Sequence, residues 1–285
     1  MATVTQDFTT DDIEYFRIGD RSLKLRLYKP AGTGPFPVIV LLHGGAWNKG
    51  DYKQCDGQGE AWARAGLATA SLDFRHAADG YPSSLVDTNY AVRWLKAHAG
   101  DLDLDSGRVG LSGQSSGGHL AMLAAMRPND PRYSASALGD GKESIDATVT
   151  CVGMQWPVIN PLSRYRHAKR AIAEQASGSW ADGMPKSHDI YWGTEANMEE
   201  GNPMLALERG ESLVLPPALW VQGQPDPVHD YRDLDSDSEL NEPERFAKNY
   251  RGAGGEIEIV YIDNSVRSSA ASYDPLAAFF RKHLI

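Results

Sequence analysis

Short apolar runs and longer stretches with helical spacing alternate along this chain. Residues 37–42 are apolar throughout, which is typical of a strand buried on both faces of a parallel sheet. Residues 82–99 instead carry Val86, Tyr90 and Trp94 four positions apart, which indicates a helix. Because strand-like and helix-like stretches follow one another, the pattern predicts an α/β fold with a mostly parallel central sheet flanked by helices.

The same reasoning predicts elements along the whole chain, which is expected to form a single domain over residues 1–285. The expected strands are 13–18, 23–28, 37–42, 67–73, 108–112, 147–154, 217–223 and 257–262. The expected helices are 58–64, 82–99, 117–126, 165–174, 240–252 and 275–284. From 155 to 211 the pattern loosens into polar, aromatic and Pro/Gly-rich sequence with one helical piece. We expect this stretch to be a lid or cap insertion within the domain.

The chain is acidic, with 28 Lys and Arg against 38 Asp and Glu and a formal charge of −10. Because nucleic acid and anionic membrane surfaces are bound by clustered basic residues, neither is expected as a partner. No apolar run is long enough to span a bilayer, and residues 1–15 do not resemble a secretion signal, so a cytoplasmic location is expected. Cys55 and Cys151 are too few for a disulfide framework. The sequence leaves the oligomeric state open and allows a homodimer.

A serine flanked by glycines stands between a predicted strand and a predicted helix. Residues 113–117 read Gly-Gln-Ser-Ser-Gly, which fits the pattern Gly-x-Ser-x-Gly. That pattern needs a strand before it and a helix after it, because the turn is sharp and its neighbours must lack bulk. Such a turn lifts a hydroxyl above the strand ends and aims a helix N-terminus at developing negative charge. We therefore predict that Ser115 is a nucleophile.

A second glycine-containing turn, His-Gly-Gly-Ala-Trp at 43–47, directly follows the buried strand. Glycines let the backbone approach a substrate carbonyl oxygen with amide hydrogens directed at it. We expect the amides of Gly44, Gly45 and Ser116 to form an oxyanion hole, in which losing one donor typically costs about 3 to 4 kcal/mol of barrier. His43 is interpreted as a hydrogen-bonding residue that shapes the loop.

Further short segments accompany the two glycine turns, at 73–75 (Asp-Phe-Arg), 82–87, 93–95 (Arg-Trp-Leu) and 117–121 (Gly-Gly-His-Leu-Ala). Together these residues resemble the hormone-sensitive-lipase-like and kynurenine-formamidase-like esterases of the α/β-hydrolase superfamily. The resemblance is dense from 37 to 125 and thinner towards the C-terminus. It implies an α/β-hydrolase fold and a carboxylic ester or amide hydrolase with a Ser-Asp-His triad, without a metal or another cofactor.

In the resembled family the acidic partner follows the next-to-last strand. Here the strand 217–223 is followed by Gln-Pro-Asp, which makes Asp226 the expected acid. Its carboxylate would orient the base and stabilise the imidazolium. Asp230 and Asp233 lie close by in the sequence and are alternatives, although a solvated acidic loop accounts for either.

The resemblance also predicts a histidine in the loop after the last strand, but residues 263–273 contain none. A serine with an ordinary hydroxyl pKa is a poor nucleophile without a base to take its proton. Three explanations compete: His229 reaches the serine from the acid loop, a histidine has been replaced at about Ala270, or the protein is a relative with lost or altered chemistry. We select His229 as the candidate base because it lies three residues after Asp226.

The other histidines fit the role less well. His283 belongs to the end of the closing helix and is expected to be solvated. His119 lies on the helix after the nucleophile and is expected to pack, whereas His188 lies in the insertion and could act only if a lid folds over the site.

Aromatic residues in the oxyanion turn and the insertion offer an apolar pocket. Trp47 and Trp156 are the candidates for the substrate pocket, since both follow predicted strand ends. The leading function is hydrolysis of a small or medium carboxylic ester, or of an aryl amide or formamide, through an acyl-enzyme intermediate. The alternatives are a catalytically impaired chain whose catalytic histidine is substituted and a non-catalytic ligand-binding homologue.

Overall fold

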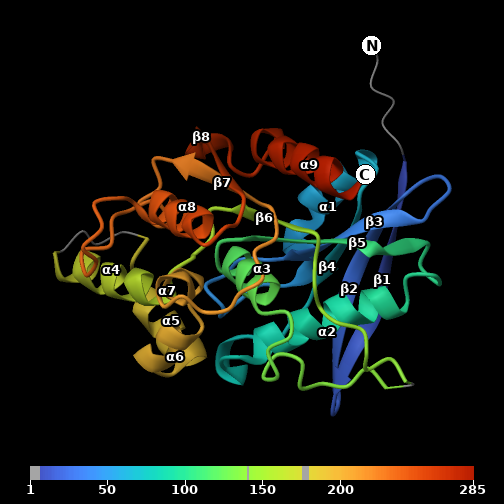
Figure 1. Cartoon of the computed structure of the whole chain (residues 1–285), viewed down its shortest axis with the longest axis horizontal. Helices are drawn as coiled ribbons and strands as arrows, with labels where there is room; N and C mark the ends of the chain where they lie inside the picture. Colours follow the sequence, from blue (N-terminus) through green and yellow to red (C-terminus); the bar gives the residue numbers. More distant parts are fainter. Residues whose placement is uncertain (1–6, 140, 175–179) are drawn as a thin grey trace.

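The computed structural model describes residues 7–139, 141–174 and 180–285. Its centre is one eight-stranded sheet with the strand order β1-β2-β4-β3-β5-β6-β7-β8 (Figure 1). The strands from β3 to β8 are parallel to one another, and β1 and β2 pair in the antiparallel sense. The strands are Phe8–Ile18 (β1), Arg21–Pro30 (β2), Phe36–Leu42 (β3), Ala68–Leu72 (β4), Leu104–Gln114 (β5), Cys151–Gln155 (β6), Ala218–Gln224 (β7) and Ile257–Asp263 (β8).

Helices cover both faces of this sheet. Along β3 the side chains of Val38, Val40 and Leu42 face one core, and those of Ile39 and Leu41 face a second core on the other side. The first core is closed by α2 (Ser83–Ala97), α3 (Ser116–Met126) and α8 (Glu242–Gly252), and the second by α1 (Asp56–Arg64) and α9 (Ala270–Leu284). Burial on both faces explains why 37–42 is apolar at every position. The α/β class and the mostly parallel sheet are therefore confirmed.

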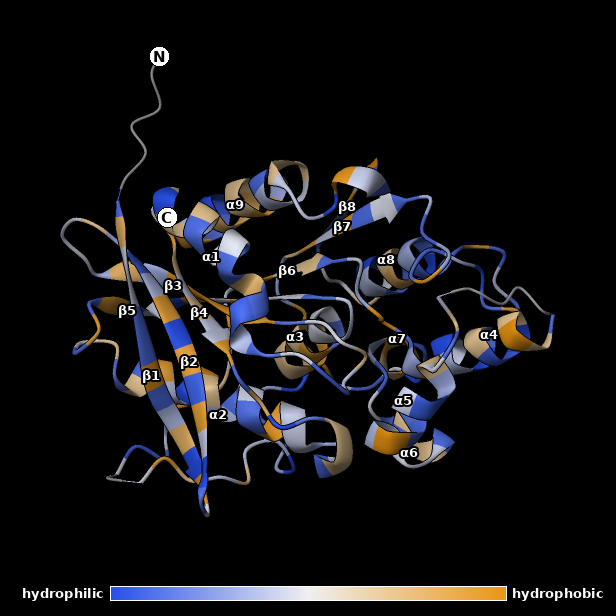
Figure 2. Ribbon diagram, turned by 180° about the vertical axis from the view of Figure 1, so that it is seen from behind, coloured by the Kyte–Doolittle hydropathy of each residue, from blue (hydrophilic) through white to orange (hydrophobic). Residues whose placement is uncertain are grey.

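The hairpin of β1 and β2 has a different pattern because its outer face is covered only in part, where Tyr28 packs against Gly59 of α1. Figure 2 shows hydrophilic and hydrophobic residues interleaved along these two strands. In β2 the side chains of Leu23, Leu25 and Leu27 are buried, whereas Lys24 between them is exposed. Alternation of this kind is expected for an antiparallel pair with one face on the core and one in water.

The strand order reverses direction at β3, so that the turns after two neighbouring central strands lie together at the carboxyl ends of those strands. From β3 the chain passes to β4 on one side, and then returns to form β5 on the other side of β3. In open α/β sheets, ligands bind beyond the carboxyl ends of the strands at such a switch point. Here the residues that follow β3 and β5 are the two glycine turns, so the fold places them side by side.

The insertion between β6 and β7 contains more helix than the sequence pattern predicts. It holds α4 (Pro161–Ala173), α5 (Met184–Trp192), α6 (Glu195–Glu200) and α7 (Pro203–Glu208), of which only α4 was expected. The other three are six to nine residues long, too short for an apolar period to stand out. Their starts are nevertheless marked by N-caps: the side chains of Thr194 and Asn202 accept backbone N–H groups of α6 and α7.

The boundaries of several strands also differ from the expectation: β1 begins at Phe8 rather than at 13, and β2 extends two residues further at each end than predicted. β5 is longer than predicted at both ends, and β6 begins at Cys151 rather than at 147. The backbone N–H of Thr150 already bonds to the carbonyl of Val109, so the chain joins the sheet one residue before β6 begins. Cys151 is fully buried between the layers, as a small core residue should be.

Candidate active site

The candidate nucleophile lies in a tight turn between β5 and α3. Ser115 has a φ of 52° and a ψ of −119°, a backbone conformation that is strained for a residue with a side chain. A Cβ atom added at Gly113 would lie 2.3 Å from backbone atoms of Gly117, and one added at Gly117 would lie 2.3 Å from the carbonyl oxygen of Leu42. Only glycine fits at these two positions, which explains the flanking residues of the motif. The turn leaves Gln114 and Ser115 half-buried, whereas Gly113 and Ser116 on either side of them are buried.

The glycine turn after β3 lies directly against this serine. A Cβ atom added at Gly44 would be 3.4 Å from the Cβ of Ser115. Gly45 has a φ of 120°, and its added Cβ would lie 1.9 Å from the carbonyl oxygen of Lys49, so a side chain is excluded there as well. Within the described residues, the amides of Gly44, Gly45 and Ser116 donate to no backbone acceptor. Three backbone donors are thus left available beside the Ser115 hydroxyl.

His43 holds the glycine turn in shape. Its imidazole is 1% exposed, stacks on the ring of Phe74 with 4.3 Å between centroids, and places Nδ1 2.7 Å from the carbonyl oxygen of Gly44. Burial lowers the pKa of His43 to about 4, so the ring is neutral at pH 7. The geometry matches the structural role expected for this histidine.

The loop after β7, residues 225–241 and here called the acid loop, brings a carboxylate and an imidazole to the serine. The Nδ1 of His229 is 2.8 Å from Oδ2 of Asp226, and its Nε2 is 3.0 Å from Oγ of Ser115. The backbone N–H groups of His229 and Asp230 both donate to the carbonyl oxygen of Asp226. This turn puts side chains three residues apart on the same side, which is why one short loop supplies both groups.

Burial governs the charges of this pair. It lowers the pKa of His229, and the hydrogen bond and the negative charge of Asp226 only partly offset that effect. For Asp226, burial favours the neutral form, but the hydrogen bond from His229 and the surrounding positive charge leave its pKa below the usual value. At pH 7 the arrangement is a carboxylate beside a neutral imidazole, which is the protonation state that a general base needs.

Two arginines that sequence reasoning missed lie close to the pair. Arg164 of α4 and Arg267 of the loop after β8 both contribute positive charge that lowers the pKa of His229. Arg267 also lies with its guanidinium carbon 5.5 Å from the centre of the Trp156 ring. No local motif marks either arginine, because both reach the site through the packing of distant segments.

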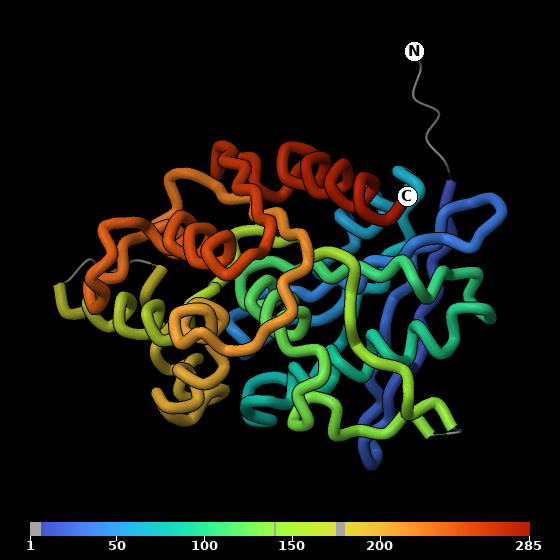
Figure 3. Tube along the Cα trace, viewed as in Figure 1, coloured from blue at the N-terminus to red at the C-terminus, as the bar shows by residue number. Residues whose placement is uncertain are grey.

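Contacts with the insertion hold the acid loop in place. The ring of Tyr231 stacks on His167 of α4 at 4.0 Å between centroids, and its hydroxyl accepts a hydrogen bond from Ser163. The Nε2 of His167 lies 3.1 Å from the carbonyl oxygen of Pro227. Figure 3 shows the acid loop and α4 together at the same end of the molecule.

The remaining candidates occupy other surroundings. His119 is fully buried and lies between the Nε1 of Trp47, 3.2 Å away, and the carbonyl oxygen of Gly201, so it packs as expected. His188 is also buried, with its ring 5.2 Å from that of Trp47. His283 is at the end of α9.

The two tryptophans predicted to line a pocket are almost completely buried. Trp47 is 2% exposed and is surrounded by the rings of His119, His188, Tyr191 and Trp192. Trp156 is 4% exposed and directly follows Gln155, whose carbonyl oxygen accepts the backbone N–H of Ser115. The structure therefore places Trp156 next to the nucleophile turn and Trp47 within an aromatic cluster under the insertion.

The arrangement of serine, histidine, aspartate and free backbone amides is that of a serine hydrolase, and a comparison with family models agrees with the geometry. The model called BD-FAE matches residues 25–232, which is more than half of the chain. The chain belongs to the BD-FAE family. The matched range includes both glycine turns, the insertion, Asp226 and His229.

Curated relatives of this BD-FAE chain are named as ester hydrolases. It is 27% identical to the carboxylic ester hydrolase LipN of Mycobacterium tuberculosis over 91% of its own length and 66% of LipN. It is 32% identical to the probable carboxylic ester hydrolase LipM of the same organism, over 47% of its length and 32% of LipM. An arylesterase of Saccharolobus solfataricus is 23% identical over 75% of the chain and 65% of the relative. The matched segment thus spans less than two thirds of these relatives.

Solved structures confirm the α/β-hydrolase fold of the BD-FAE chain. The carboxylesterase EstE1, cloned from a metagenomic library, superposes with a TM-score of 0.74 at 23% identity, covering 99% of this chain and 92% of EstE1. A hyperthermophilic esterase from Pyrobaculum calidifontis gives a TM-score of 0.73 at 20% identity, covering 98% and 88%.

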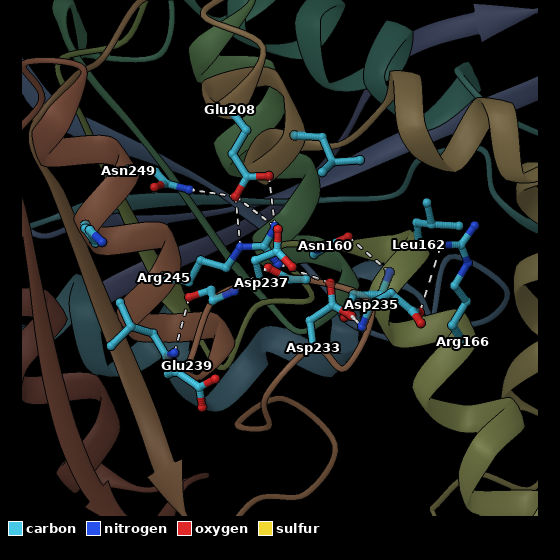
Figure 4. Close-up of a pocket in the computed structure, with 16 residues that line it drawn as sticks. Asn160, Leu162, Arg166, Glu208, Asp233, Asp235, Asp237, Glu239, Arg245 and Asn249 are labelled. Atoms are coloured by element: carbon cyan, nitrogen blue, oxygen red, sulfur yellow. Dashed lines mark hydrogen bonds and ion pairs between the residues drawn. The ribbon is translucent and has the colours of Figure 1, made fainter.

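A separate cavity of about 790 Å³ lies between α4, α7, α8 and the acid loop of the BD-FAE chain (Figure 4). Arg245 lines this cavity, and its guanidinium forms ion pairs with Glu208 at 2.8 Å and with Asp233 at 3.1 Å. The cavity contains none of the groups around Ser115, and Asp233 is engaged in this ion pair rather than near the serine. Within residues 7–139, 141–174 and 180–285, no group of three or more His, Cys, Asp or Glu could hold a metal ion, and no helix could cross a membrane.

Proposed function

We propose that this BD-FAE chain is a serine hydrolase that cleaves small or medium carboxylic esters through an acyl-enzyme intermediate. The observation that carries the proposal is the continuous contact from Asp226 through His229 to the hydroxyl of Ser115, with distances of 2.8 and 3.0 Å. It is the nucleophile, base and orienting acid arrangement required for acyl transfer. The names of the curated relatives support the same reaction.

In the first half of the reaction, Oγ of Ser115 forms a bond to the ester carbonyl carbon and passes its proton to Nε2 of His229. The carbonyl oxygen becomes an oxyanion, which the amides of Gly44, Gly45 and Ser116 stabilise. Collapse of this intermediate breaks the bond to the alcohol oxygen, which leaves with the proton from His229. Asp226 keeps Nδ1 protonated and stabilises the imidazolium throughout.

In the second half, a water molecule attacks the acyl carbon of the acyl-enzyme and gives its proton to His229. A second oxyanion forms in the same amide cradle. The bond between the acyl carbon and Oγ of Ser115 then breaks, the serine recovers its proton from His229, and the carboxylic acid is released. No other group has to supply or accept a proton, because one imidazole serves both halves.

The proposal includes four further features. The insertion at 155–211 acts as a cap, since α4 holds the acid loop. Trp156 forms part of the substrate pocket because it adjoins the nucleophile turn. Trp47 supports the wall of this pocket through its contact with His188. The protein acts in the cytoplasm, which agrees with two free buried cysteines, and a homodimer would use the open edge of β8.

Turnover of 4-nitrophenyl acetate and butyrate tests the reaction class. We expect hydrolysis by the wild-type chain and a loss of at least about 10⁴-fold in Ser115→Ala. Ser265→Ala, which removes an exposed hydroxyl after β8, is the matched control and should retain the wild-type rate. A silent wild-type chain that binds esters tightly would contradict the proposal and favour a non-catalytic binding protein.

The Ala270→His variant separates the proposed base from a lost histidine. Because the imidazole of His229 already stands 3.0 Å from the serine oxygen, a second histidine at 270 should not raise turnover. A gain of orders of magnitude in this variant would instead identify position 270 as the site of a substituted base.

A further inference from the structure

Arg267 is an exposed cation next to the candidate nucleophile turn. Its guanidinium lies over Trp156, which is joined to that turn because the carbonyl oxygen of Gln155 accepts the N–H of Ser115. Among the described residues, no carboxylate lies within 4.0 Å of Arg267, although its positive charge acts on both Asp226 and His229. The guanidinium therefore retains free N–H donors close to the candidate acid and base.

Arg164 is a second cation near the same histidine. It is 2% exposed, and its Nη2 contacts the sulfur of Met184 at 2.8 Å, while Nε and Nη1 have no hydrogen-bond partner among the described residues. Arg164 and His229 line one small cavity of about 10 Å³. Burying a cation without a carboxylate is costly, so its positive charge at this place calls for a functional reason.

The other arginines of the insertion and the acid loop do not share this property. Arg166 and Arg170 of α4 pair with Glu195 and Asp235, and the remaining two pair with carboxylates as well: Arg209 with Glu211 and Arg232 with Glu239. Elsewhere on this chain of formal charge −10, Arg93, Arg251 and Arg281 also lack a carboxylate, but their guanidinium groups donate to backbone carbonyl oxygens, whereas among the described residues those of Arg164 and Arg267 donate to none. That distribution makes the site electropositive on an acidic protein, and such a field concentrates anionic ligands.

From these observations we infer that the preferred substrates are anionic esters, in which a carboxylate on the acyl or the alcohol part binds the guanidinium of Arg267. The ester carbonyl then lies over Ser115, and the buried charge of Arg164 adds to the attraction without being screened by solvent. Arginine suits this task because its planar donors match a carboxylate in pairs. The inference rests on the proposed ester hydrolysis and specifies its substrate class.

The carboxylate of Glu242 does not cancel the field of Arg164. Glu242 lines the same small cavity, but its carboxyl group faces Arg245, with 3.7 Å between Oε1 and Nη1, and burial raises its pKa to about 8. Asp226 is committed to His229. A substrate carboxylate is thus the counter-charge that the site lacks at neutral pH.

Two pairs of esters of equal size test the inference. On the alcohol side, 4-acetoxybenzoate is compared with 4-acetoxybenzamide; on the acyl side, monomethyl terephthalate is compared with methyl 4-carbamoylbenzoate. Each pair differs only in one negative charge, and the para position prevents the carboxylate from assisting its own hydrolysis. The readout is the ratio of kcat/KM for the anionic and the neutral ester, measured in wild type, Arg267→Gln, Arg267→Lys and Arg267→Glu.

We expect the wild type to prefer the anionic ester in at least one pair. The ratio should fall about fivefold in Arg267→Gln, the effect of losing a partly exposed ion pair. It should fall less in Arg267→Lys, which keeps the charge but loses the paired donors, and it should invert in Arg267→Glu. Arg17→Gln on β1, at the opposite edge of the sheet, changes the net charge equally and should leave the ratio unchanged.

Binding gives a result that does not depend on turnover. Titration calorimetry of monomethyl terephthalate and methyl 4-carbamoylbenzoate into Ser115→Ala should favour the anion, and Arg267→Gln in that background should remove the preference. Neutral esters bound and hydrolysed as well as anionic ones would overturn the inference while leaving the ester hydrolase intact. Preferential binding of the anion with no turnover of any ester would support the inference and contradict the proposed reaction.

Discussion

The two halves of the candidate active site are built in different ways. The nucleophile turn and the glycine turn beside it follow adjacent strands, and backbone contacts fix their shape, since a Cβ atom added at Gly117 would lie only 2.3 Å from the carbonyl oxygen of Leu42. The acid loop, in contrast, is positioned by side chains of the insertion and of α8. Tyr231 contacts α4, and Asp233 binds Arg245. The first half is local and rigid, whereas the second depends on partners far apart in the sequence.

This difference explains how the candidate base can lie in the acid loop instead of in the loop after the last strand. The nucleophile turn cannot be moved without changing the strands themselves. The base, in contrast, requires only a loop that brings an imidazole within hydrogen-bond distance of the Ser115 oxygen. A turn that places residues 226 and 229 on the same side satisfies that need from the acid loop alone, and leaves the loop after β8 free to supply Arg267 instead.

The largest effect in the acid loop is expected from Asp226→Asn. An amide at 226 no longer fixes the tautomer of His229 or stabilises its charged form, so kcat should fall about 10⁴-fold. Asp230→Asn is the matched control, because Asp230 binds Gln224 and Asn241 instead of the imidazole and should cost less than about tenfold. Equal losses in the two variants, measured with 4-nitrophenyl butyrate, would mean that the loop as a whole matters rather than this carboxylate.

The nucleophile turn should break when a single methyl group is added. In Gly117→Ala the new Cβ would lie 2.3 Å from the carbonyl oxygen of Leu42, so the turn or β3 must shift and the amide donors lose their alignment. We expect kcat/KM to fall about 10²- to 10³-fold. Gly100→Ala meets no atom within 4 Å and should behave as the wild type. Wild-type activity in Gly117→Ala would contradict the conclusion that backbone contacts fix the shape of the nucleophile turn.

Arg245→Met tests the half that depends on distant partners. The substitution removes the cation that binds Asp233 and Glu208 and leaves the buried carboxyl group of Asp233 without its partner, which should lower the free energy of unfolding by about 3 kcal/mol. Arg232→Met, which breaks an exposed pair with Glu239 in the same loop, should cost under about 1 kcal/mol. Denaturant titration measures both, and similar values would show that the loop is not anchored at Arg245.

The sequence predicts the rigid half almost completely. Ser115 and Gly44 belong to motifs in which a particular backbone conformation requires glycine. That conformation can therefore be inferred from the positions of the glycines. The strands and helices around them have lengths at which the apolar period is clear. These features follow from short-range stereochemistry.

The second half could be predicted only in part. The pairing of Asp226 with His229 was one of several interpretations, because a loop sequence does not reveal which way its side chains point. Arg164 and Arg267 were missed since their positions depend on α4 and on the loop after β8 packing against the same turn. The short helices α5 to α7 were missed because six to nine residues are too few for an apolar period to stand out.

The smallest effect concerns the pH profile. Burial lowers the pKa of His229 from its ordinary value of 6.5, so kcat/KM should rise with pH through a midpoint below 6.5 and then level off. The charged groups facing this ring are Asp226 of its own loop, Arg164 of α4 and Arg267 after β8, and Glu242 lines the cavity behind it. Arg267→Gln removes a positive charge and should move the acid limb to higher pH. A midpoint above 6.5 in the wild type would contradict the lowered pKa.

The central claim is that His229, supplied by the acid loop, activates Ser115. The most direct measurement is the rate at which a fluorophosphonate probe labels the protein, followed by intact mass and by mapping the modified peptide. We predict a single adduct on Ser115 in the wild type, labelling at least about 10³-fold slower in His229→Ala, and an unchanged rate in His283→Ala. Labelling of His229→Ala at the wild-type rate, or an adduct outside Ser115, would contradict the account.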